Sequence, residues 1–258
     1  MQIFLSHDVD WPKPGPGKEH IIARKDRFET EVLQKVSSAN FNPYYGIRRI
    51  MEIEKENGLR STFFFRPQYD DSSSAHQYAE DIKDLELGGW EVGVHLNDSS
   101  PTESVVSQKR VIDSMLAKPC RGTRVHYLRI EASDLPELGR AGFVYDSSLT
   151  FSKNSIDERN AKVLKMGAIF ELPITIMDAY LFSYMQVKEE EIVNFVVSRI
   201  KNLKRNGMEF CSILWHDNVL LMRGGRKYEQ LIQEISSIQG IEIRRGIDVV
   251  ASLSKESA

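Results

Sequence analysis

The sequence opens with residues 1–11, MQIFLSHDVDW, in which an apolar segment ends in polar and acidic residues. Ile3 and Leu5 occupy alternate positions, which predicts a short strand with at least one buried face. Alternate residues of a strand point to the same side, so Asp8 and Asp10 are expected to lie next to each other. Neighbouring carboxylates repel, and a bound cation commonly offsets that repulsion. This opening therefore predicts a strand with a cation site at its end.

Strand-like and helix-like segments alternate along the rest of the chain. Further strands are expected at residues 61–65, 90–96, 120–128, 142–149, 168–176, 209–217 and 241–246. Helices are expected at residues 42–57, 75–87, 102–117, 132–140, 188–205 and 226–238, whereas residues 11–20, WPKPGPGKEH, predict a loop. Such alternation predicts one α/β domain over residues 1–258, with a parallel sheet covered by helices. For this number of strands, a barrel is expected rather than an open sheet.

The composition argues against a nucleic-acid-binding protein, a membrane-spanning protein and a disulfide-rich protein. A formal net charge of −3 implies no basic face of the kind that nucleic-acid binding requires, and no apolar run is long enough to predict a membrane span. Cys120 and Cys211 border or lie within apolar segments, which favours buried thiols over a disulfide framework. No leader-like segment precedes the first strand, so we expect a cytoplasmic protein.

Acidic and imidazole side chains follow several of the predicted strands. They are Asp8, Asp10, His95, His126 and His216. The carboxyl ends of parallel strands meet on one face, where barrel enzymes have their active sites. Carboxylate and imidazole donors make up open zinc sites, and a further carboxylate and imidazole can act as base and acid. Each residue alone is more often a cap or a core residue, so the prediction depends on their conjunction.

These segments resemble the motifs of the polysaccharide deacetylases, the NodB-homology superfamily that includes carbohydrate esterase family 4. SHDVD (6–10) is similar to the first motif, and WEVGVHL (90–96) to the second. RVHYL (124–128) is similar to the third motif, and ILWHD (213–217) to the final Leu-x-His motif. The resemblance covers nearly the whole chain and implies a distorted (β/α) barrel of about seven parallel strands.

The resemblance also implies an activity, the metal-dependent hydrolysis of an N-acetyl group on an amino sugar or a sugar conjugate. Asp8 would be the general base, and Asp10 and His95 would be ligands of Zn²⁺ or another divalent transition metal such as Co²⁺. His216 would be the general acid that protonates the leaving amine.

Three further residues receive roles from the resemblance. Arg124 would orient the base, with Asp146 as its support. The backbone N–H of Tyr127 would help to form an oxyanion hole.

One position departs from the family pattern. A second ligand histidine is expected four residues after His95, where this chain has Ser99. We favour His126 as the replacement ligand, because zinc sites tolerate relocation of a ligand when the donor type is kept. The alternatives are that Asp98 supplies an oxygen ligand or that the site has lost the metal.

Two rival functions fit the same sequence. One is hydrolysis of a cyclic amide or ureide by an allantoinase-like enzyme, and the other is a catalytically silent carbohydrate-binding or scaffolding protein. In each case the partner is a small molecule or a glycan conjugate. The sequence leaves open whether the chain forms a homo-oligomer.

Overall fold

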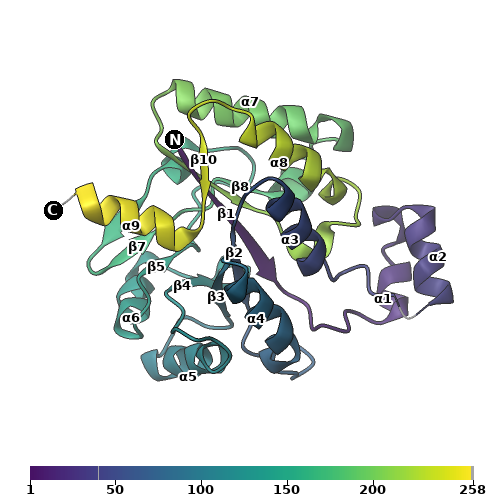
Figure 1. The fold of residues 1–258 in the computed structure, drawn as a ribbon, viewed down its shortest axis with the longest axis horizontal. Coiled ribbons are helices and arrows are strands. Elements are labelled where there is room, and N and C mark those ends of the chain that lie inside the picture. The colour runs from purple at the N-terminus through teal and green to yellow at the C-terminus, as the bar shows by residue number, and fades with distance from the viewer. Residues whose placement is uncertain (40, 257–258) are drawn as a thin grey trace.

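The strands of the computed structural model join one curled sheet (Figure 1). The model describes residues 1–39 and 41–256. Its strands are β1 (Gln2–Val9), β2 (Thr62–Phe65), β3 (Glu91–Leu96), β4 (Gly122–Val125), β5 (Tyr145–Asp146), β6 (Leu164–Met166), β7 (Ile169–Glu171), β8 (Ile176–Met177), β9 (Phe210–Leu214) and β10 (Glu242–Arg244). Their order is β6-β7-β5-β4-β3-β2-β1-β9-β8, and β10 pairs with the start of β1. The pairs are parallel except β6 with β7.

Helices surround this sheet. The α-helices are α1 (Lys18–Ile22), α2 (Thr30–Ser38), α3 (Ile47–Glu56), α4 (Ala79–Leu87), α5 (Thr102–Asp113), α6 (Leu135–Arg140), α7 (Ile192–Arg205), α8 (Tyr228–Ser236) and α9 (Gly246–Glu256). Short 3₁₀ turns are η1 (Lys25–Arg27), η2 (Ala75–Tyr78), η3 (His126–Leu128), η4 (Ala132–Asp134), η5 (Glu158–Ala161), η7 (Glu189–Glu191), η8 (Asp217–Val219) and η9 (Gly225–Lys227), and η6 (Tyr180–Tyr184) is a π-turn. Within the described residues, no helix has the length and apolarity to cross a bilayer.

The predicted α/β class and distorted-barrel architecture are confirmed, but the sheet has ten strands rather than about seven. The segment expected as one strand at 168–176 is divided into β7 and β8, because Pro173 between them has no N–H for a ladder. β7 pairs with β5 and β8 pairs with β9, so this one segment connects opposite sides of the curled sheet. The helices α1, α2 and α9 were not predicted. The predicted domain, 1–258, also includes residues 40, 257 and 258, which lie outside the described residues.

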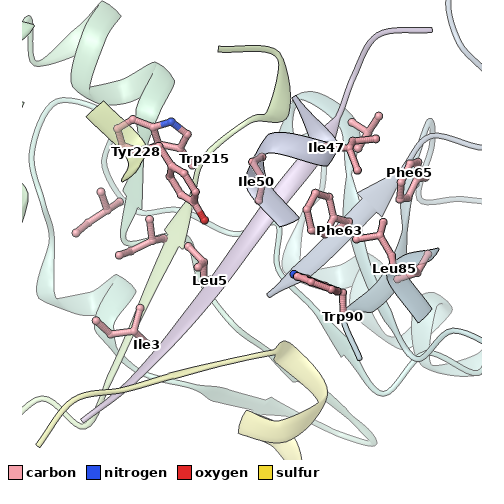
Figure 2. Packing of buried hydrophobic residues seen from close by; sticks show 14 of the residues in the cluster. Ile3, Leu5, Ile47, Ile50, Phe63, Phe65, Leu85, Trp90, Trp215 and Tyr228 are labelled. Carbon is pink, nitrogen blue, oxygen red and sulfur yellow. The ribbon is translucent and has the colours of Figure 1, made fainter. Parts of the chain in front are cut away.

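Alternate residues of the central strands enter two different cores. Ile3 and Leu5 of β1 pack outward against the helices, together with Phe63 and Phe65 of β2 (Figure 2). Phe4 points into the barrel interior, where Phe64, Tyr145 and Phe210 accompany it. The strand is therefore buried on both faces, as parallel strands between a core and covering helices require.

Two glycines make room for this aromatic interior. A Cβ atom at Gly93 would lie 2.6 Å from the ring of Phe64, and one at Gly122 would lie 2.2 Å from the ring of Tyr145. Neighbouring rings therefore fill the space that a side chain would need. This close packing explains the Gly in WEVGVHL without any catalytic role.

The parallel register aligns the strand ends. Val9, Phe65, Val94 and Thr123 form one row across β1, β2, β3 and β4. The next residue of each strand reaches the C-terminal rim of the barrel, and these residues are Asp10, Arg66, His95 and Arg124.

A buried carboxylate joins several elements beneath this rim. Glu54 of α3 accepts hydrogen bonds from the His7 ring at 2.8 Å, the Trp90 indole at 2.6 Å and the Tyr228 hydroxyl at 2.7 Å. Ser61 donates a fourth bond at 2.8 Å. Burial alone would raise the pKa of Glu54. The hydrogen bond and charge of His7, together with the hydrogen bonds from Tyr228 and Trp90, lower it. His7 thus has a structural position, since its ring contacts Glu54 and the backbone of Trp215.

We expect Glu54→Ala to lower the free energy of unfolding by about 3–5 kcal/mol, because it leaves several buried donors without an acceptor. Urea unfolding followed by circular dichroism measures the loss. Glu56→Ala, on the exposed side of the same helix, is the matched control and should change stability by less than about 0.5 kcal/mol. Equal unfolding midpoints for the two variants would contradict the role assigned to Glu54.

Candidate active site

Three side chains from the ends of β1, β3 and β4 converge on the rim. Asp10 follows β1, His95 belongs to β3, and His126 follows β4. Asp10 Oδ1 lies 3.1 Å from His95 Nε2 and 3.4 Å from His126 Nδ1, and the two nitrogens are 3.0 Å apart. These residues form a group that could hold a metal ion.

The size of this triangle suits a first-row divalent ion. Ligand atoms at about 2.0–2.1 Å from a tetrahedral ion lie about 3.3 Å from one another. The three observed separations are close to that value. The donor set, two imidazole nitrogens and one carboxylate oxygen, is one that Zn²⁺ accepts in catalytic sites with an open position. The residues present therefore fit the metal that the sequence predicts.

Hydrogen bonds and burial prepare these groups for metal binding. His95 Nδ1 donates to the backbone oxygen of Arg124 at 3.1 Å, which leaves the Nε2 lone pair directed into the site. Burial lowers the pKa of His126 and favours the neutral imidazole that metals bind. Burial alone would raise the pKa of Asp10, but the close contacts with His126 and His95, with the charge of His216, lower it well below its usual range. Asp10 is therefore ionised.

The position of the missing histidine lies outside this group. Ser99 Oγ donates a hydrogen bond to Asp134 at 3.3 Å. Asp98 accepts hydrogen bonds from Ser104 and Gln108 instead. Neither Ser99 nor Asp98 joins the metal-binding group in the described structure, whereas His126 does.

A second carboxylate, Asp8, lies beside the candidate metal group of Asp10, His95 and His126. Its Oδ1 accepts a 2.7 Å hydrogen bond from Arg124, and its Oδ2 lies 3.7 Å from His95 Nε2. Arg124 is fully buried and also donates to Ser6 Oγ, Ser147 Oγ and the Ser147 backbone oxygen. These bonds fix both the orientation and the charge environment of Asp8.

Asp146 is expected from the resemblance to support Arg124, and the charge of Arg124 does act on its carboxyl. No described hydrogen bond joins Asp146 to Arg124, and the hydroxyls of Ser6 and Ser147 take that place. Asp146 accepts from Ser148 and is buried beside Glu171. Burial raises the pKa of both carboxyls, and the charge of Asp146 raises that of Glu171 further. Ionisation of both carboxyls is therefore disfavoured, because two buried carboxylates side by side repel.

His216, which follows β9, lies close to both Asp8 and Asp10. Its Nε2 lies 3.5 Å from Asp10 Oδ2 and 4.0 Å from Asp8 Oδ2. Its Nδ1 is bound to Asp178 Oδ1 at 2.7 Å, and its backbone N–H donates to Asp178 Oδ2 at 2.7 Å. Burial alone would lower the pKa of His216, but Asp178, with help from Asp10 and Asp8, raises it to about 10.

Asp178 rather than Asp217 is therefore the partner of His216. Asp217 accepts a hydrogen bond from the backbone N–H of Gly46 at 3.2 Å. Burial, together with the charges of Asp10 and Asp8, raises the pKa of Asp217 to about 8. The sequence signal for Asp178 is its place two residues after the segment 168–176, directly after β8.

Tyr127 follows His126 in a left-handed backbone conformation. Its φ is 57° and that of Leu128 is 55°, two consecutive non-glycine residues in a region that costs about 1–3 kcal/mol each. Tyr127 is 65% exposed, and its ring lies tilted by 43° against the His126 ring with 3.9 Å between centroids. Such strain commonly accompanies functional sites. The predicted role of the Tyr127 N–H stays a prediction.

Comparison with known proteins gives similarity in structure alone. No family model and no curated protein matches the sequence. A solved structure named as a polysaccharide deacetylase from Mycobacterium smegmatis matches with a TM-score of 0.68 and 15% identity, over 99% of this chain and 91% of that one. One named as a polysaccharide deacetylase from Pseudomonas aeruginosa matches with a TM-score of 0.67, 15% identity and the same coverages. A CE4 family pseudoenzyme from Bacillus anthracis matches with a TM-score of 0.55 and 12% identity, over 96% and 65%.

The chain thus has the fold of the polysaccharide deacetylases, and the resemblance of its motifs is confirmed at the level of the fold. Because one of these structures is a pseudoenzyme, the fold alone does not decide the activity.

We expect His126→Ala to weaken Zn²⁺ binding about a hundredfold or more, because it removes one of three donors. Equilibrium dialysis with metal analysis measures the affinity. Ser99→Ala is the matched control and should bind about one equivalent, like the unmodified chain. The assignment fails if Ser99→Ala loses the metal and His126→Ala keeps it.

Proposed function

We propose that this protein is a metal-dependent hydrolase that removes an N-acetyl group from an amino sugar or a sugar conjugate. The observation that carries the proposal is the placement of an oriented carboxylate and an oriented imidazole on either side of a metal-type donor group. The fold shared with solved polysaccharide deacetylases supports it.

The residues of the donor group would be Asp10, His95 and His126. A divalent ion such as Zn²⁺ or Co²⁺ held by these residues would lower the pKa of a bound water molecule and polarise the amide carbonyl. The identity of the metal is part of the proposal.

Asp8 would take the proton of the attacking water. Arg124 occupies Oδ1, so Oδ2 is the oxygen that faces the rim and is free for proton transfer. A fixed orientation of this kind lowers the entropy that the reaction must otherwise lose.

His216 would donate a proton from Nε2 to the leaving amine. Asp178 holds Nδ1, so the second proton of the imidazolium lies at Nε2, directed toward the two aspartates. The backbone N–H of Tyr127 would stabilise the developing oxyanion, a contribution typically worth about 3–4 kcal/mol.

The deciding experiment compares substrates. The full chain is depleted of metal, reconstituted with Zn²⁺ or Co²⁺, and assayed for acetate release from N-acetyl amino sugars and for ring opening of cyclic ureides. We expect metal-dependent acetate release. Turnover of a ureide without any acetate release would favour the allantoinase-like alternative, and metal binding without any turnover would favour the silent protein.

We expect Asp8→Asn to reduce kcat by about 10²–10⁴-fold, the usual contribution of a general base, while Zn²⁺ is still bound. Acetate release and metal content are measured on the same preparation, and circular dichroism checks that the variant is folded. An Asp8→Asn protein that is folded, loaded with metal and fully active would show that another group is the base.

We expect Asp178→Asn to lower the pKa of His216, because the carboxylate is the main group that raises it. The general acid works in its protonated form, so activity is lost as the pH rises through its pKa. The basic limb of the profile of kcat/KM against pH should therefore move to lower pH in the variant. If the basic limb stays at the same pH in the variant, His216 is not the general acid.

A further inference from the structure

A small helical lobe lies directly beside the candidate site. We define the helical lobe as α1, η1 and α2, which extend from the barrel beyond the arrowhead of β1 (Figure 1). Phe28 of this lobe forms a bridge to Met222 in the segment after η8, and both belong to one apolar cluster. Trp11 packs against the same cluster and directly follows Asp10. The apolar cluster of the helical lobe thus packs against a residue that is joined to a candidate metal ligand by one peptide bond.

Two polar atoms at this junction are buried without a partner. Within the described structure, neither His20 Nε2 nor the Tyr44 hydroxyl has a hydrogen-bond partner. Tyr44 is 3% exposed, so solvent does not satisfy its hydroxyl. The ring centroids of His20 and Tyr44 are 5.8 Å apart, and they lie 4.8 and 5.2 Å from the Trp11 ring, respectively. Buried polar groups normally have partners, so these two point to a ligand or a water molecule.

Two exposed arginines of the helical lobe, Arg24 and Arg27, carry positive charge that no carboxylate of the described residues neutralises. Arg24 donates to the His20 backbone oxygen at 3.3 Å, and Arg27 lies one helical turn further along the chain. No carboxylate of the described residues lies within ion-pair distance of either guanidinium. By contrast, Arg223 and Arg226 on the adjacent segment both pair with Glu29. Burial and then the charges of Arg24 and Arg27 lower the pKa of His20, which agrees with their proximity.

We propose that His20, Arg24, Arg27 and Tyr44 form a subsite that binds a phosphate group of the substrate. The inference rests on the proposed function and makes the substrate a phosphorylated amino sugar. Guanidinium groups bind phosphate oxygens through paired hydrogen bonds, and a hydroxyl and an imidazole N–H supply further donors. The Trp11 ring contacts both His20 and Tyr44, and Trp11 directly follows Asp10, so the proposed subsite adjoins the candidate metal group.

The test measures binding separately from catalysis. The full chain, depleted of metal so that phosphate cannot bind to an ion, is titrated in a calorimeter with N-acetylglucosamine, N-acetylglucosamine 1-phosphate and N-acetylmuramic acid. The phosphorylated sugar should bind at least about tenfold more tightly than the neutral one. Arg24→Ala and Arg27→Ala should each remove most of this preference, whereas Lys25→Ala, an exposed basic neighbour, should retain it.

A conservative variant separates binding from a structural role. Tyr44→Phe keeps the ring and removes a hydroxyl that has no partner, so the thermal midpoint of the free protein should not fall, whereas the affinity for the phosphorylated sugar should fall several-fold.

The outcomes distinguish the two proposals. Equal affinity for the phosphorylated and neutral sugars would overturn the subsite, even if acetate release is observed. Equal affinity for the carboxylate sugar and the phosphorylated sugar would overturn its assignment to phosphate. Phosphate-dependent binding that requires Arg24 and Arg27, without any deacetylation, would support the subsite and refute the deacetylase.

Discussion

The buried ion pair between Asp8 and Arg124 is the interaction on which the site depends. A guanidinium inside a barrel loses its hydration, and only a close carboxylate with several further acceptors makes that position stable. Asp8 supplies the charge, and Ser6 and Ser147 supply acceptor oxygens. The pair spans from β1 to β4 and fixes one oxygen of Asp8. The other oxygen is therefore directed toward the metal-type group, which is where the proposed chemistry needs a base.

Much of this arrangement could be predicted from the sequence because parallel strands align their ends. The alternation of apolar and polar residues in β1 correctly predicts that Asp8 and Asp10 are neighbours on one side, and His7 on the other. Since each motif residue follows a strand, the topology alone brings Asp10, His95, His126 and His216 to one rim. The choice of His126 over Ser99 followed from donor chemistry, and the structure has His126 Nδ1 in the group.

Other features depend on tertiary contacts that no local pattern reveals. The hydroxyls that bind Arg124 belong to serines, which are common on any surface, so the sequence favoured the more conspicuous Asp146. The helices α1 and α2 follow a loop rich in Pro and Gly, and their few apolar residues are stabilised by packing on Trp11, Tyr44 and Met222. The burial of β1 on both faces likewise reflects the aromatic interior, in which Gly93 and Gly122 make room for rings.

The position of His126, rather than Ser99, beside Asp10 and His95 determines how the candidate metal group is anchored. All three donors now belong to the ends of β1, β3 and β4 or to the residue that follows them, whereas Ser99 lies in a loop beyond β3. The sheet would thus hold the metal ligands in place, and metal binding would not require the loop between β3 and α5 to become ordered. This loop supplies none of the three candidate ligands, so insertions or length changes in it would leave the candidate metal group intact.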